Sequence, residues 1–133
     1  MRTGTLKHPK DATTTAKDHL FDMNGPMIVE AIREVGIDFL EKVRPGLSSR
    51  LPYDYDLVVP HQPSGTAMDM LVAHGWPREQ TISIIGELGN CVAASTGMAL
   101  YEAVKSGRLQ RGMKFIMCGT GGGITLGAVV MTY

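Results

Sequence analysis

The chain has 133 residues, of which 44% are hydrophobic, and thirteen Lys and Arg balance thirteen Asp and Glu. This length suits one average domain with a core of its own, and the zero net charge argues against a strongly basic protein that binds nucleic acid or anionic lipid. Two cysteines are too few for a disulfide framework, and no apolar run approaches the roughly 18 residues of a membrane span, so we expect a cytoplasmic protein without one.

The first part of the chain, residues 1–19, is polar. It carries Lys7, Lys10 and Lys17 together with a run of threonines, and it has almost no apolar residues from which to build a core. We therefore predict an exposed connector or arm over 1–19 and a folded domain over 20–133.

A helix is predicted to begin at Asn24-Gly25-Pro26, because Asn and Gly cap helices and Pro suits a first turn. Pro45-Gly46 is expected to end it. Between these signals apolar residues recur at helical spacing, with charged residues around the rest of the helix. The apolar positions are Ile28, Ile32, Val35, Phe39 and Val43.

Strand and helix patterns alternate along the rest of the chain. Short β-branched runs predict strands, and segments with helical spacing closed by glycine predict helices. We predict a strand at 56–59, a helix at 63–74, a strand at 81–85, a helix at 92–106, and strands at 113–118 and 124–132. This order is typical of an α/β fold, with a mixed sheet, helical crossovers and a C-terminal antiparallel β-hairpin.

The helix predicted at 92–106 is unusual because it has no charged residue from Val92 to Leu100. A helix that is apolar or small all round is normally buried on every face. One sheet with a helical layer on each side cannot easily bury a helix twice. The chain is therefore predicted to lack half of its core, which a second copy or an N-terminal half would supply.

Three candidate functional positions directly follow predicted strands or the loop after one: His61, Asn90 and the glycines of 119–123. Ligands of open α/β sheets bind at the edge where parallel strands end. Donors from a His and an Asn side chain can stabilise one oxyanion or enolate, and a glycine N–H can add another. Simpler alternatives remain open, namely a solvated His61 and a plain hairpin turn. Ile124 replaces the third glycine of a dinucleotide fingerprint, and no helix follows it.

Three segments of the chain stand in a characteristic order and spacing: Pro60-His61-Gln62, Gly89-Asn90-Cys91-Val92-Ala93-Ala94-Ser95 and Gly119-Thr120-Gly121-Gly122-Gly123-Ile124-Thr125-Leu126-Gly127-Ala128. Together they resemble the C-terminal half of β-ketoacyl-acyl-carrier-protein synthase III. The likeness runs from about Phe21, near the Met-x-Gly sequence at Met23, to Tyr133. It implies that 20–133 is the C-terminal half of a thiolase-like fold, in which two α/β halves enclose their central helices between two sheets. Such burial would account for the uncharged helix.

The resemblance implies an acyltransferase of fatty-acid or polyketide-type biosynthesis that performs a decarboxylative Claisen condensation. By the same resemblance, His61 and Asn90 stabilise the enolate of a malonyl thioester, and the N–H of Gly122 completes the acyl oxyanion hole. The nucleophilic cysteine of the family belongs to the N-terminal half, so this chain alone is expected to be inactive. Expected substrates are phosphopantetheine thioesters of CoA or acyl carrier protein, without a tightly bound cofactor. Expected partners are the N-terminal half and a second copy in a homodimer.

Other functions are weaker alternatives. Cys118 lies two residues too early to match the base cysteine of thiolases, where this chain has Thr120, and Cys91 stands beside Asn90 without a partner base. A metal site built from His8, His19 or His74 lacks ligand spacing. The main rival is a non-catalytic partner half that keeps the scaffold.

The chain also departs from the family in residues that hold the substrate. It has Pro63-Ser64-Gly65-Thr66 where the family commonly has Ala-Asn and then a basic residue that helps to hold the carrier protein. Leu126 replaces a frequent Trp, and Val29 replaces an aromatic residue of the pantetheine channel. Carrier docking and the acyl group are therefore left open.

Overall fold

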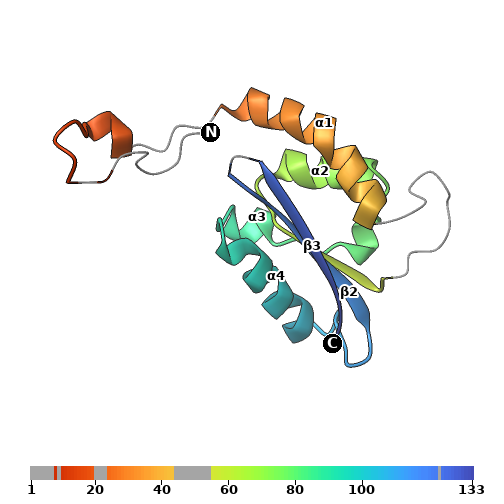
Figure 1. The fold of residues 1–133 in the computed structure, drawn as a ribbon. Coiled ribbons are helices and arrows are strands. Elements are labelled where there is room, and N and C mark those ends of the chain that lie inside the picture. Colours follow the sequence, from red (N-terminus) through yellow and green to blue (C-terminus); the bar gives the residue numbers. More distant parts are fainter. Residues whose placement is uncertain (1–7, 9, 20–23, 44–54, 123) are drawn as a thin grey trace.

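The computed structural model describes residue 8 and residues 10–19, 24–43, 55–122 and 124–133 (Figure 1). The elements in chain order are a short 3-10 helix η1 (Ala16–His19), α1 (Gly25–Val43), β1 (Leu57–Pro60), α2 (Gly65–Ala73), a second 3-10 helix η2 (Arg78–Gln80), α3 (Ile85–Leu88), α4 (Ala94–Lys105), β2 (Lys114–Gly121) and β3 (Thr125–Thr132). No residue of η1 is buried, and Figure 1 shows this segment extending away from the sheet. The division of the chain at residue 20 stays a prediction.

The strands form a three-stranded mixed sheet in the order β1-β2-β3. Strand β1 runs parallel to β2, with Leu57 opposite Phe115, and β3 runs antiparallel to β2. The β2–β3 pairing extends from Lys114 opposite Thr132 to Gly121 opposite Thr125. The predicted α/β fold with a mixed sheet and a C-terminal hairpin is confirmed.

Local signals explain where the outer helices begin and end. Asn24 caps α1, since its Oδ1 accepts the N–H of Met27 at 3.1 Å, and Ser64 Oγ accepts the N–H of Ala67 at 3.1 Å in the first turn of α2. Gly75 follows α2 with φ +94°, a conformation that only glycine adopts at little cost. Both predicted helices are confirmed. The predicted stop signal of α1, at 45–46, lies outside the described residues.

Alternating side chains build a core on each face of the sheet. On one face Leu57, Val59 and Phe115 pack with Ala99 and Ala103 of α4. The opposite face carries Val58 and Ile116, which pack against Trp76. Figure 1 shows α4 on one side of the sheet and α1 and α2 on the other. The short β1 is buried from both sides and therefore holds the next residue, His61, in a well-defined place.

The strand predicted at 81–85 is wrong. Thr81 makes an isolated parallel bridge to Val58, and the chain then enters α3. The pairing with β1 stops after this bridge because the next pair requires a main-chain N–H from Pro60, and proline has none. The isoleucines at 82 and 84 are nevertheless buried, so the β-like apolar pattern reports a core position and not a strand.

Helix α4 confirms the helix predicted at 92–106. The sheet buries a stripe of small residues on it, namely Ser95, Ala99 and Ala103. The other side stays open: Val92 just before the helix is 70% exposed and Tyr101 within it is 62% exposed. Val129 of β3, which pairs with Met117 on the same face of the sheet as α4, is 49% exposed. That a further half covers this surface remains a prediction.

Candidate functional site

His61 lies where β1 ends, directly beside β2. Its main-chain N–H donates to the carbonyl oxygen of Cys118 at 2.7 Å, which continues the parallel pairing by one residue. A Cβ added to Gly119 would stand 3.5 Å from the Cβ of His61. The backbone and the Cβ of His61 are therefore fixed at the carboxyl end of the sheet, the edge at which ligands of α/β folds bind.

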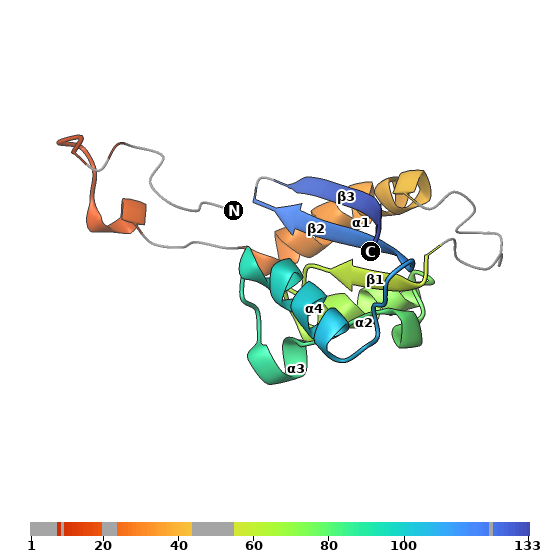
Figure 2. The ribbon, with the colours of Figure 1, turned by 90° about the horizontal axis from the view of Figure 1, so that it is seen from below.

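The other two predicted site residues lie in loops that flank the sheet elements. Gly122 belongs to the exposed turn between β2 and β3, and Asn90 lies in the exposed loop between α3 and α4. Figure 2 shows the hairpin turn and the start of α4 at the end of the sheet where β1 stops. The described contacts join His61 to β2 but not to Asn90 or Gly122. The convergence of the three on one substrate stays a prediction.

The loop that carries Asn90 is locally constrained. The N–H of Val92 donates to Asn90 Oδ1 at 2.8 Å, and the N–H of Cys91 donates to Ser95 Oγ at 3.1 Å. Val92 has φ +52°, which is strained for a β-branched residue and is a feature that clusters at functional sites. The bond to Val92 engages the oxygen of the Asn90 carboxamide and not its NH₂ group, which is the donor end that an oxyanion requires.

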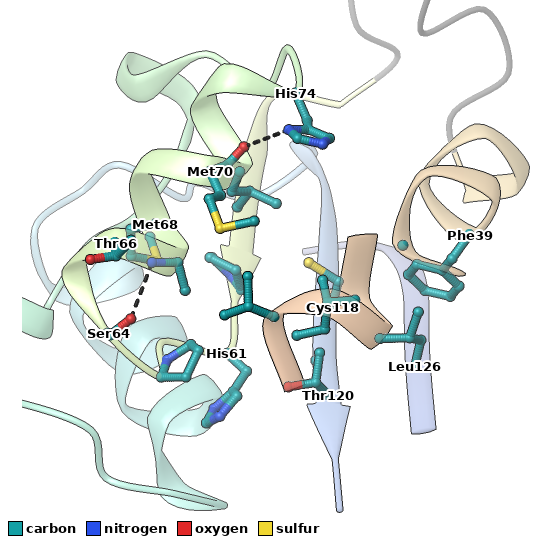
Figure 3. A pocket seen from close by; sticks show the side chains of 18 of the residues that line it. Phe39, His61, Ser64, Thr66, Met68, Met70, His74, Cys118, Thr120 and Leu126 are labelled. Atoms are coloured by element: carbon teal, nitrogen blue, oxygen red, sulfur yellow. Dashed lines mark hydrogen bonds between the residues drawn. The ribbon is translucent and has the colours of Figure 1, made fainter. Parts of the chain in front are cut away.

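An apolar cavity of about 220 Å³ opens beside His61 between α1, α2 and the sheet. Figure 3 shows His61 and Ser64 on one side of it and Phe39 and Leu126 on the opposite side. Cavities of this kind suit an alkyl or acyl chain better than a charged ligand. The apolar lining includes Val29, Ile32, Phe39, Ala67, Met70, Leu71 and Leu126.

Burial lowers the pKa of His61 below its usual range. A partly buried imidazole loses solvation when it takes up a proton, so the neutral form is favoured at pH 7. A neutral imidazole still has one N–H donor, and it can offer that donor to a carbonyl oxygen.

A pH titration tests this state of His61. The midpoint of its imidazole signals in an NMR titration is expected below the ordinary value of about 6.5. The unfolded chain then takes up this proton at a higher pH than the folded chain. The stability that His61 contributes is therefore complete above pH 6.5 and is lost as the pH falls through the folded pKa. A His61→Asn variant should lack this part of the pH dependence, and a midpoint at or above 6.5 would contradict the account.

Burial raises the pKa of the Cys118 thiol to about 11. Cys118 is thus a protonated thiol in the cavity wall at neutral pH, which argues against it as a nucleophile. The Cys91 thiol donates to the carbonyl oxygen of Leu88 at 3.5 Å. No group of three or more His, Cys, Asp and Glu side chains with described positions is arranged to hold a metal ion. No helix in the described stretches is long and apolar enough to cross a membrane.

Two features of this region did not follow from the sequence. The cavity depends on how α1 and α2 pack across the sheet, and in the sequence Phe39 is only one apolar position of a helical pattern. Gln62 belongs to the segment Pro60-His61-Gln62, which by itself assigns it no role, but its side chain is fully buried. The sequence signal for a role of Gln62 is Pro60, two residues earlier. Proline has no N–H, so the strand pairing next to it lacks a donor that another group must supply.

Comparison with known proteins agrees with the family resemblance of the sequence. Residues 48–133 match the family model described as 3-oxoacyl-[acyl-carrier-protein (ACP)] synthase III C terminal. The β-ketoacyl-[acyl-carrier-protein] synthase III of Desulfitobacterium hafniense is 34% identical over 98% of this chain and 40% of its own length. The corresponding protein of Aquifex aeolicus is 37% identical over 79% of this chain and 33% of its own length.

Solved structures agree with these sequence relatives. The 3-oxoacyl-(acyl carrier protein) synthase III of Pseudomonas aeruginosa matches with a TM-score of 0.71 and 27% identity, over 90% of this chain and 38% of that chain. The β-ketoacyl-[acyl carrier protein] synthase III of Thermus thermophilus matches with a TM-score of 0.70 and 30% identity, over 90% of this chain and 37% of that chain. The chain spans about 40% of the length of the curated relative from Desulfitobacterium hafniense. It has the α/β fold of one thiolase-like half and belongs to the family of 3-oxoacyl-[acyl-carrier-protein] synthase III C-terminal domains.

Proposed function

We propose that this chain is the C-terminal half of an acyltransferase that condenses an acyl thioester with a malonyl thioester. The observation that carries the proposal is the placement of His61 against β2 at the carboxyl end of the sheet, beside an apolar cavity. Asn90 lies in the loop between α3 and α4, and its carboxamide oxygen accepts the N–H of Val92. Figure 2 shows the start of α4 at the same end of the sheet. Two N–H donors and an apolar chamber are what a thioester carbonyl with a hydrocarbon arm requires.

In the proposed reaction the bond between the carboxylate carbon and the methylene carbon of the malonyl group breaks. Carbon dioxide leaves, and the electron pair moves onto the thioester oxygen as an enolate, to which His61 and Asn90 donate hydrogen bonds. The enolate carbon then attacks the acyl carbonyl, and the cysteine thiolate of the N-terminal half leaves. The N–H of Gly122 stabilises the oxyanion of this second step. A neutral His61 suits its role, because a donor is needed and a net charge is not.

The partners in this proposal are an N-terminal half that supplies the nucleophilic cysteine, and CoA or acyl-carrier-protein thioesters as substrates, in fatty-acid or polyketide-type synthesis without a tightly bound cofactor. The open side of α4 and the side of the outer strand β3 that faces α4 offer the surface for the other half, through Val92, Tyr101 and Val129. An exposed apolar surface of this kind is typical of an interface. A homodimer of the completed protein is part of the same proposal.

The test joins this chain to the N-terminal half of the Desulfitobacterium hafniense relative in one polypeptide, here called the completed enzyme. We expect it to acylate its cysteine and to release labelled carbon dioxide from a malonyl thioester, while this chain alone does neither. The intact relative serves as the positive control. A completed enzyme that acylates its cysteine but releases no carbon dioxide would contradict the proposal and would instead identify the chain as a non-catalytic partner half.

A further inference from the structure

Gln62 is a fully buried polar residue whose side chain is satisfied at both ends. Its exposed fraction is 0%. Its Nε2 donates to the carbonyl oxygen of Ile82 at 3.1 Å, and its Oε1 accepts the N–H of Ile84 at 2.8 Å. A buried carboxamide with a donor and an acceptor both engaged on one backbone segment acts as a specific clamp.

The two hydrogen bonds of the Gln62 side chain are those that the next residue pair of a parallel strand pairing would make. The bridge between Val58 and Thr81 places the N–H of Ile82 on the carbonyl oxygen of Val58 at 2.9 Å. The next rung of such a ladder would bring an N–H from position 60 to the Ile82 carbonyl and a carbonyl from position 60 to the Ile84 N–H. Pro60 has no N–H to give. The Gln62 side chain, which carries the same two groups as a peptide bond, makes both bonds in its place.

The clamped segment leads directly to Asn90. The carbonyl oxygen of Ile84 accepts the N–H of Leu88 at 2.9 Å and so begins the single turn of α3. The N–H of Gly89 then donates to Ile85 at 3.0 Å, and Asn90 follows. A helix of one turn is not stable by itself, so its direction depends on how its first residue is held.

We propose that Gln62 is a positioning residue, which fixes the distance between His61 and Asn90 by replacing the ladder rung that Pro60 cannot make. This inference rests on the proposed function for its effect on catalysis. His61 is joined to Gln62 by one peptide bond, and Asn90 is held to it through Ile84 and α3. One carboxamide therefore connects both donors of the proposed oxyanion site.

Arg108 provides a matched control, because it holds the same segment at its other end. Its guanidinium donates to the carbonyl oxygen of Glu79 at 2.6 Å and to that of Thr81 at 3.4 Å. An Arg108→Ala variant loses backbone hydrogen bonds of a similar kind. It leaves the entry into α3 unchanged, so it separates general weakening of the segment from displacement of Asn90.

The first measurement is amide hydrogen exchange of the chain, which does not depend on activity. In Gln62→Met the amides of Ile84, Glu87 and Leu88 are expected to exchange at least about tenfold faster, because the start of α3 loses its anchor. In Arg108→Ala these three amides should keep the wild-type rate. Equal exchange of the Leu88 amide in wild type and Gln62→Met would overturn the proposal whatever the catalytic result.

The second measurement is the kinetics of the completed enzyme. Gln62→Met is expected to lower the kcat of malonyl decarboxylation by about 10- to 100-fold, as misplacement of a reacting group by about 1 Å does, while acylation of the cysteine stays near the wild-type rate. In Gln62→Glu a protonated carboxyl restores one donor and one acceptor, so its rate relative to wild type should rise as the pH falls. Absence of this rescue, or equal loss of acylation and decarboxylation, would count against positioning.

The two failures can be told apart. A wild-type completed enzyme without decarboxylation would remove the proposed function, and the exchange rates would then decide alone whether Gln62 holds α3. A wild-type enzyme that decarboxylates, together with a Gln62→Met variant as active as Arg108→Ala, would remove only the role assigned to Gln62.

Discussion

Replacing His61 or Asn90 by alanine in the completed enzyme is expected to slow malonyl decarboxylation by about 100-fold or more. Each replacement removes one of the hydrogen bonds to an oxygen that becomes negative in the transition state, and loss of one such donor costs on the order of 10²–10³ in rate. Acylation of the cysteine should survive, because the proposed nucleophile lies in the N-terminal half. The assay follows labelled carbon dioxide and, by mass spectrometry, the acylated cysteine.

Two comparisons make this result specific. His19→Ala removes an exposed histidine of η1 and should leave both steps unchanged. The double variant of His61 and Asn90 should be much less than multiplicative relative to the single variants, because the two donors act on one oxygen. An equal loss of acylation and decarboxylation would point to misfolding, and a fully multiplicative double variant would indicate two separate sites.

Replacing Trp76 by alanine is expected to lower the free energy of unfolding by about 3–5 kcal/mol, the usual cost of removing a large buried aromatic side chain. Trp76 is fully buried and packs against Val58 and Ile116 under the sheet face that carries α2. Unfolding in urea, followed by far-ultraviolet circular dichroism, measures the change. Tryptophan fluorescence cannot follow the unfolding of the variant, because Trp76 is the one tryptophan of the sequence.

Trp76→Phe is the control for this prediction. The indole Nε1 is buried and has no hydrogen-bond partner among the described residues. Phenylalanine therefore forfeits no hydrogen bond and removes an unsatisfied donor, so its loss of stability should be clearly smaller than that of alanine. A loss below about 1 kcal/mol for Trp76→Ala would show that this core is not tightly packed.

The sequence predicted those parts of the fold that depend on local signals. Asn24 caps α1 as the capping rule expects, and the C-terminal hairpin forms as predicted. Its first strand continues through Gly121, so the predicted end at residue 118 is wrong. The strand at 81–85 could not be excluded locally, because its apolar pattern suits a buried strand equally well. The strand is stopped by Pro60, which lies more than twenty residues away in the chain. The side chain of Gln62 makes the two hydrogen bonds that Pro60 cannot bring about.

The candidate site shows the same division between local and distant causes. His61, Asn90 and Gly122 were predicted to share one end of the sheet because each follows a predicted strand or the loop after one. The resemblance names two residues that line the cavity, Val29 and Leu126, but the cavity itself was not predicted, since it arises where two helices far apart in the chain pack over the sheet. The uncharged stretch from Val92 to Leu100 predicts a helix that is buried on every face. Val92 is 70% exposed in this chain, and its burial by a further half stays a prediction.

The most direct test of the central claim is a crystal structure of the completed enzyme with a malonyl thioester analogue that cannot lose carbon dioxide. The account predicts that one imidazole nitrogen of His61 and the amide nitrogen of Asn90 both lie about 2.7–3.1 Å from the thioester oxygen. An imidazole and a carboxamide directed to opposite faces of the sheet, with the thioester oxygen in contact with neither, would contradict it.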